Sequence, residues 1–251
     1  MKEKDVKILG IIPARGGSKG IPRKNIIPIC GKPLIQYTIE VVAKSKMIDA
    51  SIISTDDVEI AEVAKKLGAD VPFLRPKDLA RDDSPDIDFL VHAVSWLEKN
   101  RGWDPDIVVL LQPTMPFRTV EDVDAVLKFM VEQKCDSVRT ISVPHITPYK
   151  MWFLEDIKSG KISPVLKTKY YDSLLTDVPR QKLRTVYWQP GVAIATRTEF
   201  IKKGRVFGPD IRGFIIDPEH CFDIDEPLDL KIAELLMTEK HKKANKNEKQ
   251  D

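Results

Sequence analysis

A glycine-rich loop follows a short apolar run in the segment Ile11-Ile12-Pro13-Ala14-Arg15-Gly16-Gly17-Ser18-Lys19-Gly20-Ile21-Pro22-Arg23-Lys24-Asn25. The run that ends at Ile12 has the length and composition of a buried β-strand. The three glycines of the loop, Gly16, Gly17 and Gly20, let the backbone turn several N–H groups toward an anion. The same loop carries four cations, Arg15, Lys19, Arg23 and Lys24. We therefore predict a strand followed by a phosphate-binding loop, and we expect its ligand to be a triphosphate.

The spacing excludes the two commonest phosphate-binding motifs. A Walker loop needs Gly-Lys followed by Ser or Thr, whereas Lys19 is followed by Gly20. The G-x-G-x-x-G pattern of dinucleotide-binding folds is also absent. A solvated basic turn is the alternative on composition alone, and Arg23 by itself could be a surface charge.

Composition narrows the class of protein. The 251 residues suit one α/β domain, and 40 Lys and Arg against 38 Asp and Glu leave a net charge of only +2. This balance argues against a nucleic-acid partner. Polar residues 1–5 precede a run too short to span a membrane, so we expect no signal peptide, no membrane partner and a cytoplasmic location. Three scattered cysteines indicate reduced thiols.

Strand and helix patterns alternate along the first 143 residues. Strand candidates lie at 8–12, 51–54, 71–74, 107–111 and 137–143. Amphipathic helix patterns separate them, one of them introduced by an Asp56…Glu59 capping box. This alternation predicts an α/β fold with a mostly parallel sheet wrapped by helices.

The rest of the chain departs from this rhythm and then resumes it. Prolines and aromatic residues at 144–185 predict an inserted arm of two or three antiparallel strands. The α/β pattern returns at 191–196 and 213–217 and ends in a helix from 227 to about 238. We predict one domain over 1–238 and a disordered charged tail at 239–251.

Four polar loops follow the predicted strands, at 14–25, 55–57, 75–86 and 112–118. Ligands of open α/β sheets bind at the carboxyl ends of strands, near the point where the strand order reverses. We therefore expect these four loops to meet at one cleft.

Two carboxylates stand two residues apart at Asp223 and Asp225, just before the last predicted helix. In an extended segment, side chains at this spacing point the same way and can reach one hard cation. Alternatively, Asp225 is only an N-cap, with Pro227 in the first helical turn.

Several of these segments resemble the signatures of one family. Residues 11–25 are similar to the first motif of the CMP-sialic acid synthetases, which are cytidylyltransferases. Leu111 to Arg118 resembles the family's Leu-Gln-Pro-Thr-x-Pro-x-Arg, and matches to Pro-Arg-Gln at 179–181 and to Asp-x-Asp at 223–225 follow in order. The resemblance implies a Rossmann-like, doubly wound sheet of the nucleotide-diphospho-sugar transferase type, and a homodimer in which the arm at 144–185 reaches the partner.

The resemblance also implies residue roles. Catalysis falls to Arg15, Lys19, Lys24 and Asp223, with Mg²⁺ or Mn²⁺ held by Asp223 and Asp225. Substrate binding falls to Ala14, Asn25, Arg75, Ser84, Gln112, Arg180, Gln181 and Gly191. Two residues of the sugar pocket depart from the family: Trp188 replaces an Arg and Pro190 replaces an Asn. Asp86 stands where the sialic acid enzymes often have Ser or Thr.

The activity implied by the resemblance is transfer of CMP from CTP to an acidic nine-carbon 2-keto sugar, with release of pyrophosphate. Two alternatives stay open. The enzyme could act on a different acidic sugar or nucleotide, or the chain could be a nucleotide-binding regulatory relative without turnover.

Overall fold

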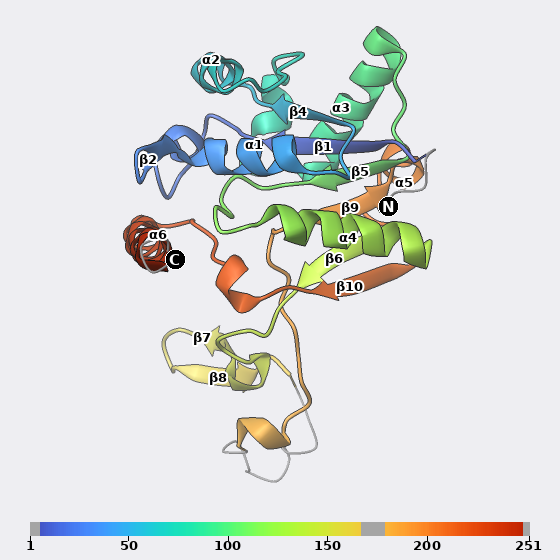
Figure 1. The fold of residues 1–251 in the computed structure, drawn as a ribbon. Coiled ribbons are helices and arrows are strands. Elements are labelled where there is room, and N and C mark those ends of the chain that lie inside the picture. The colour runs from blue at the N-terminus through green and yellow to red at the C-terminus, as the bar shows by residue number, and fades with distance from the viewer. Residues whose placement is uncertain (1–5, 167–178, 248–251) are drawn as a thin grey trace. The chain divides into compact units, whose positions relative to one another are not determined.

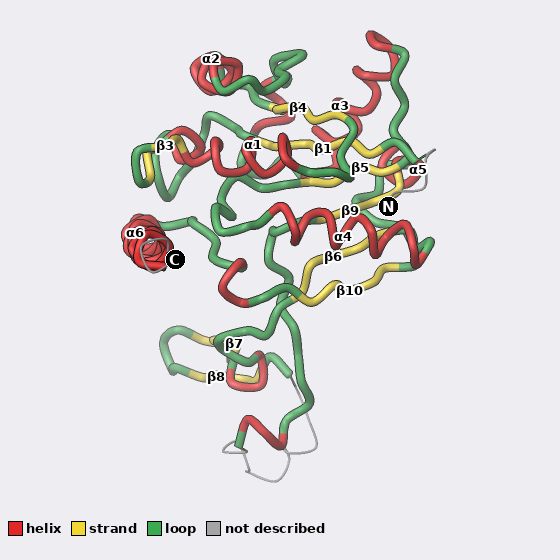
Figure 2. Tube along the Cα trace, in the orientation of Figure 1, coloured by secondary structure: helices red, strands yellow, loops and turns green. Residues whose placement is uncertain are grey.

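The computed structural model describes residues 6–166 and 179–247. The chain divides into two compact units, one made of Met1–Thr140 with Pro190–Asp251 and the other of Ile141–Gln189. Figure 1 shows the elements of both units, and Figure 2 marks the same trace by secondary structure.

The larger unit is built on a six-stranded sheet with the order β10-β6-β9-β5-β1-β4 (Figure 1). Strand β1 pairs in parallel with β4 and β5, while β9 runs antiparallel to β5 and β6. The mostly parallel, doubly wound α/β fold is therefore confirmed. Its strands are β1 (Ile8–Pro13), β4 (Ala50–Ser54), β5 (Ile107–Leu110), β6 (Ser137–Ile141), β9 (Ile194–Arg197) and β10 (Ile211–Ile215).

Helices cover both faces of this sheet (Figure 1). Helices α1 (Leu34–Lys44) and α4 (Val120–Gln133) contact each other on one face. On the other face, α3 (Asp86–Arg101) packs against α5 (Thr198–Lys202). Alternate residues of the strands point to opposite faces, and those facing α3 form one continuous core with it.

A smaller cluster lies below the loops that follow the strands. Buried Ile21 of the glycine-rich loop packs with Ile224 and with Ala233 of α6 (Pro227–Asn247). Leu34 at the start of α1 belongs to the same cluster. Burial of these apolar side chains stabilises the approach of the glycine-rich loop to the Asp223–Asp225 segment.

The second unit contains a hairpin of β7 (Trp152–Asp156) and β8 (Lys161–Pro164). Ser142 and Trp188 exchange backbone hydrogen bonds near the two ends of the unit. The sequence predicts two or three antiparallel strands in the inserted arm, and the described part of the unit contains two. The unit spans Ile141–Gln189, a longer segment than the predicted 144–185.

Short elements complete the described chain. The hairpin β2 (Pro28–Ile29) and β3 (Lys32–Pro33) precedes α1, and α2 (Val58–Lys66) follows β4. The 3-10 turns are η1 (Lys24–Ile26), η2 (Lys77–Ala80), η3 (Pro148–Lys150), η4 (Arg180–Lys182) and η5 (Pro218–His220). No helix of the described chain is long and apolar enough to span a membrane.

Three sequence expectations are wrong. Residues 71–74 form no strand, because Pro72 donates no ladder hydrogen bond and only Leu74 bridges to Thr55. Helix α2 begins after Asp57, whose side chain accepts from the Ile60 N–H, so Asp56 is not its N-cap. Helix α6 continues to Asn247, so residues 239–247 of the predicted disordered tail are helical; they are rich in helix-forming Lys.

Candidate nucleotide-binding site

A cavity of about 590 Å³ opens where β1 and β5 end. Three of the four expected loops line it, those at 14–25, 75–86 and 112–118, together with the segment around Asp223. The loop at 55–57 does not belong to the cavity lining. The predicted residues brought together here are Arg15, Lys19, Lys24, Asn25, Arg75, Ser84, Gln112, Asp223 and Asp225.

Three cations of the glycine-rich loop face this cavity, and each is paired with a carboxylate. Arg15 and Lys19 both contact Asp82, with N–O distances of 2.8 and 2.7 Å. Lys24 contacts Asp225 at 2.8 Å. The hydrogen bond from Lys19 is the main cause that lowers the pKa of Asp82. Such partly exposed pairs are weak, so a polyphosphate with more negative charge can replace the carboxylates.

Asp223 and Asp225 flank the buried Ile224, whose N–H donates to the Thr114 carbonyl at 3.0 Å. The buried Oδ1 of Asp223 has no hydrogen-bond partner. Burial raises the pKa of Asp223, and the charge of Asp225 adds to this effect, while Thr114 and Lys24 oppose it. A desolvated carboxylate oxygen of this kind lacks the partner that buried polar atoms normally have.

A magnesium ion fits this pair. Mg²⁺ is commonly held by one or two carboxylates together with substrate phosphates, so it does not need a cage of protein ligands. Within residues 6–166 and 179–247, no cluster of three or more His, Cys, Asp or Glu forms such a cage. Asp223 and Asp225 at the edge of a cationic cavity therefore suit a cation that is shared with a bound polyphosphate.

Arg75 is a buried cation of the cavity lining. Its Nε donates to the Ser54 hydroxyl at 3.0 Å, and its guanidinium lies 4.3 Å from the Phe89 ring centre. Burial lowers the pKa of Arg75 to about 10, which still leaves it protonated at neutral pH. Arg75 is only 5% exposed, so its charge is not part of a surface ion pair.

Asn25, Ser84 and Ala14 shape the loops around the cavity. The Asn25 amide donates to the Arg15 carbonyl at 3.0 Å and so fixes the glycine-rich loop across its width. The Ser84 hydroxyl donates to the Asp78 carbonyl at 2.9 Å. Ala14 is fully buried and anchors the loop through its N–H to the Ser54 carbonyl at 2.9 Å. Ala14 therefore supports the cavity without lining it.

Gln112 lines the cavity and rests on Gly191. A Cβ added at Gly191 would clash with the carboxamide of Gln112. A side chain at position 191 would therefore displace the Gln112 carboxamide from the place it holds.

Arg118 is a buried structural residue and not part of a surface ion pair. Its guanidinium is 4% exposed and donates to the carbonyls of Gln112 at 2.8 Å and of Gly191 at 3.1 Å. It also donates to the Val192 carbonyl and to the Thr38 hydroxyl. Burial lowers the pKa of Arg118 to about 9. One buried cation thus holds together the two segments that position Gln112.

Two expected sugar-binding residues belong to the second unit. Arg180 and Gln181 begin the 3-10 turn η4, and their roles stay predictions. Arg23, the fourth cation of the glycine-rich loop, does not line the cavity.

Residues 9–150 match the family model described as cytidylyltransferase. A CMP-N,N'-diacetyllegionaminic acid synthase of Legionella pneumophila is 32% identical over 92% of this chain and 97% of its own length. An N-acylneuraminate cytidylyltransferase of Escherichia coli is 29% identical over 94% of this chain, which spans only 53% of that protein.

Among solved structures, a CMP:2-keto-3-deoxy-manno-octonic acid synthetase complexed with CTP has the same fold. It superimposes with a TM-score of 0.67 over 93% of this chain and 99% of its own, at 20% sequence identity. The family model covers more than half of the chain, and the Legionella relative matches nearly end to end. The chain therefore belongs to the cytidylyltransferase family, in the group that contains the acylneuraminate cytidylyltransferases.

Proposed function

We propose that this protein transfers CMP from CTP to a sialic acid-like nonulosonic acid and releases pyrophosphate. The observation that carries the proposal is one cavity in which Arg15, Lys19 and Lys24 lie on the glycine-rich loop and Asp223 and Asp225 lie on the segment packed beside it. The relatives' names supply the substrate class.

Positioning and charge neutralisation would do most of the work in this reaction. The oxygen of the sugar's anomeric hydroxyl attacks the α-phosphorus of CTP. A bond forms between that oxygen and the phosphorus, the bond from the α-phosphorus to the pyrophosphate oxygen breaks, and the hydroxyl proton is released to solvent. Arg15, Lys19 and Lys24 would offset the charge that builds on the departing pyrophosphate. Gln112 and Arg75 are suited to hold the nucleoside end of CTP, since both line the cavity. Gln112 packs against Gly191, and Arg75 donates to the Ser54 hydroxyl.

The proposed cofactor is Mg²⁺ or Mn²⁺ held by Asp223 and Asp225. When bound, such an ion neutralises phosphoryl oxygens and lowers the pKa of a hydroxyl beside it. The unpartnered Oδ1 of Asp223 supports this assignment.

A pyrophosphate-release assay tests the proposal. The protein is incubated with CTP, Mg²⁺ and each of several 2-keto sugar acids, with ATP, GTP and UTP as comparison nucleotides. We expect release that needs CTP, the metal and a nonulosonic acid. CTP binding without release for any acid would favour a regulatory relative, and release with another nucleotide or acid would favour a different transferase.

Replacing Lys24 by Ala should weaken the use of CTP. The variant loses one charge-assisted contact to a phosphate, so KM for CTP should rise by about tenfold or more. Steady-state kinetics at saturating sugar acid measures this, with Lys66→Ala as the control because Lys66 is exposed on α2. Unchanged KM and unchanged CTP affinity by calorimetry would remove Lys24 from the site.

The acceptor should be a nonulosonic acid other than N-acetylneuraminic acid. Trp188 offers apolar area where sialic acid enzymes have an arginine that pairs with a carboxylate, and Pro190 has no side-chain amide. Loss of such a pair costs about 1.5 to 3 kcal/mol, or roughly tenfold to a hundredfold in kcat/KM. Measuring kcat/KM for N-acetylneuraminic acid against deoxygenated and di-N-acylated relatives checks this. A clear preference for N-acetylneuraminic acid would contradict it.

Homodimerisation and a cytoplasmic location also belong to the proposal. The apolar side chains of Trp152, Phe153 and Leu154 on β7 are all exposed, which supports a protein partner for the hairpin. The CTP substrate is in keeping with a location in the cytoplasm.

A further inference from the structure

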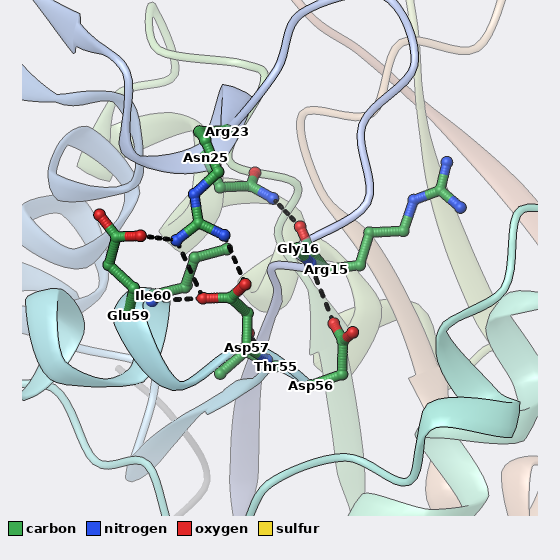
Figure 3. Close-up of polar contacts among 9 residues, drawn as sticks. All are labelled: Arg15, Gly16, Arg23, Asn25, Thr55, Asp56, Asp57, Glu59 and Ile60. Carbon is green, nitrogen blue, oxygen red and sulfur yellow. Dashed lines mark hydrogen bonds and ion pairs between the residues drawn. The ribbon is translucent and has the colours of Figure 1, made fainter.

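Arg23 is held by carboxylates outside the cavity. Its guanidinium donates through two nitrogens to the two oxygens of Asp57, at 2.5 and 3.1 Å, and also donates to Glu59 (Figure 3). The guanidinium hydrogen bond lowers the pKa of Asp57. A two-pronged pair of this type fixes the direction of both side chains. Arg23 does not line the cavity, so it is not placed to hold the phosphates, in contrast to the other three cations of its loop.

Asp57 makes two more contacts that tie the same regions together. Its Oδ1 accepts from the Ile60 N–H at 3.0 Å and caps α2. Its carboxylate also packs on Gly16, where an added Cβ would lie 2.6 Å from Oδ2. The neighbouring Asp56 accepts from the Gly16 N–H at 2.9 Å (Figure 3). The β4–α2 connection thus contacts the glycine-rich loop at Gly16, near its start, and at Arg23, near its end.

The backbone conformation of Arg23 explains why these contacts are needed. Arg23 has φ 60° and ψ 27°, a left-handed conformation that residues with a Cβ adopt at a cost. Lys24 and Asn25 follow directly in η1, and both line the cavity. The angle at Arg23 therefore decides whether these two side chains point toward the ligand.

We propose that Asp57 and Arg23 form a clamp that holds the glycine-rich loop in the conformation that binds the triphosphate. The clamp rests on the proposed function. Neither residue touches the substrate in this account, so both are positioning residues. Asp57 is the N-cap of α2, in the connection that follows β4, and it holds the loop through Arg23 and Gly16.

A double-mutant cycle tests the clamp. Asp57→Asn keeps an oxygen that can cap α2 but loses the charge, and Arg23→Met keeps the length but loses the donors. Each should raise KM for CTP by about fivefold to tenfold and leave kcat within about threefold, because a loosely held loop binds less well but still reaches the same reactive geometry. The double variant should be no worse than either single one. Arg23→Lys should recover part of the loss.

Glu62→Gln is the matched control, since Glu62 is an exposed acid of the same helix. It should leave KM unchanged. Thermal melts separate positioning from stability: a lower melting temperature with normal KM at 25 °C, or additive losses in the double variant, would overturn the clamp. If the wild-type protein neither binds nor uses CTP, the proposed function fails and the clamp fails with it. An active wild type with unaffected variants overturns the clamp alone.

Discussion

Replacing Asp223 by Asn should abolish most of the activity and leave the fold intact. Turnover with CTP should fall by about a hundredfold or more, the scale expected when a partner of the transition-state charge is lost. The melting temperature should stay the same or rise. Burial raises the pKa of Asp223, so its ionised form destabilises the folded state at neutral pH, and a neutral amide of the same size removes that cost.

Steady-state turnover and a thermal melt of the same preparation measure both effects. Asp83→Asn serves as the control, because Asp83 is exposed and does not line the cavity. A near-normal turnover of Asp223→Asn at saturating Mg²⁺ would reject the metal assignment. A loss of turnover that follows a loss of stability would make Asp223 a structural residue instead.

Replacing Arg118 by Met should give the largest loss of stability. The side chains have similar length, but Met leaves the acceptors of Gly191, Val192 and Thr38 without the guanidinium donor. Each unsatisfied buried group costs about 1 to 3 kcal/mol, so the free energy of unfolding should fall by roughly 3 kcal/mol or more. Urea denaturation followed by circular dichroism measures this change.

Arg118→Lys should restore only part of that stability, since an ammonium group cannot present the planar fork that reaches several carbonyls. Arg205→Met is the control for loss of an exposed arginine. A change below about 1 kcal/mol in Arg118→Met would mean that neighbouring groups or water replace the guanidinium, and that Gln112 is positioned by something else.

The main features of the fold were predictable because they depend on local patterns. Buried strand runs such as 8–12 and 107–111 and the stripes of the long helices are set by burial alone. The direction of β9 was not predictable in this way, because an apolar run reads the same in a parallel and an antiparallel strand. The short helix α5 carries no periodic pattern long enough to stand out.

The site was predictable where a residue type has one dominant use. Glycines beside lysines indicated the phosphate-binding loop, and the spacing of Asp223 and Asp225 indicated a cation-binding site. The partners of the acids at 56–59 were not predictable from spacing. Asp56…Glu59 has the form of a capping box, yet Asp57 caps α2, Asp56 accepts from Gly16, and Glu59 pairs with Arg23. Only the tertiary fold brings residues 34 positions apart into contact.

Arg118 shows the same limit in another form. From the sequence it is one cation at the end of a polar loop, for which an exposed ion pair is a reasonable prediction. Its burial depends on the carbonyls of residues 191–192, about 74 positions away. Long-range acceptors of this kind have no signature in the local sequence.

The central claim is that CMP moves intact from CTP to an acidic sugar. CTP labelled at the α-phosphorus tests it directly, with Mg²⁺ and the acid that gives the fastest pyrophosphate release. We expect the label to appear in a CMP-sugar, in a one-to-one ratio with pyrophosphate and only when the acid is present. Label found in free CMP or CDP at the same rate with and without the acid would contradict the account.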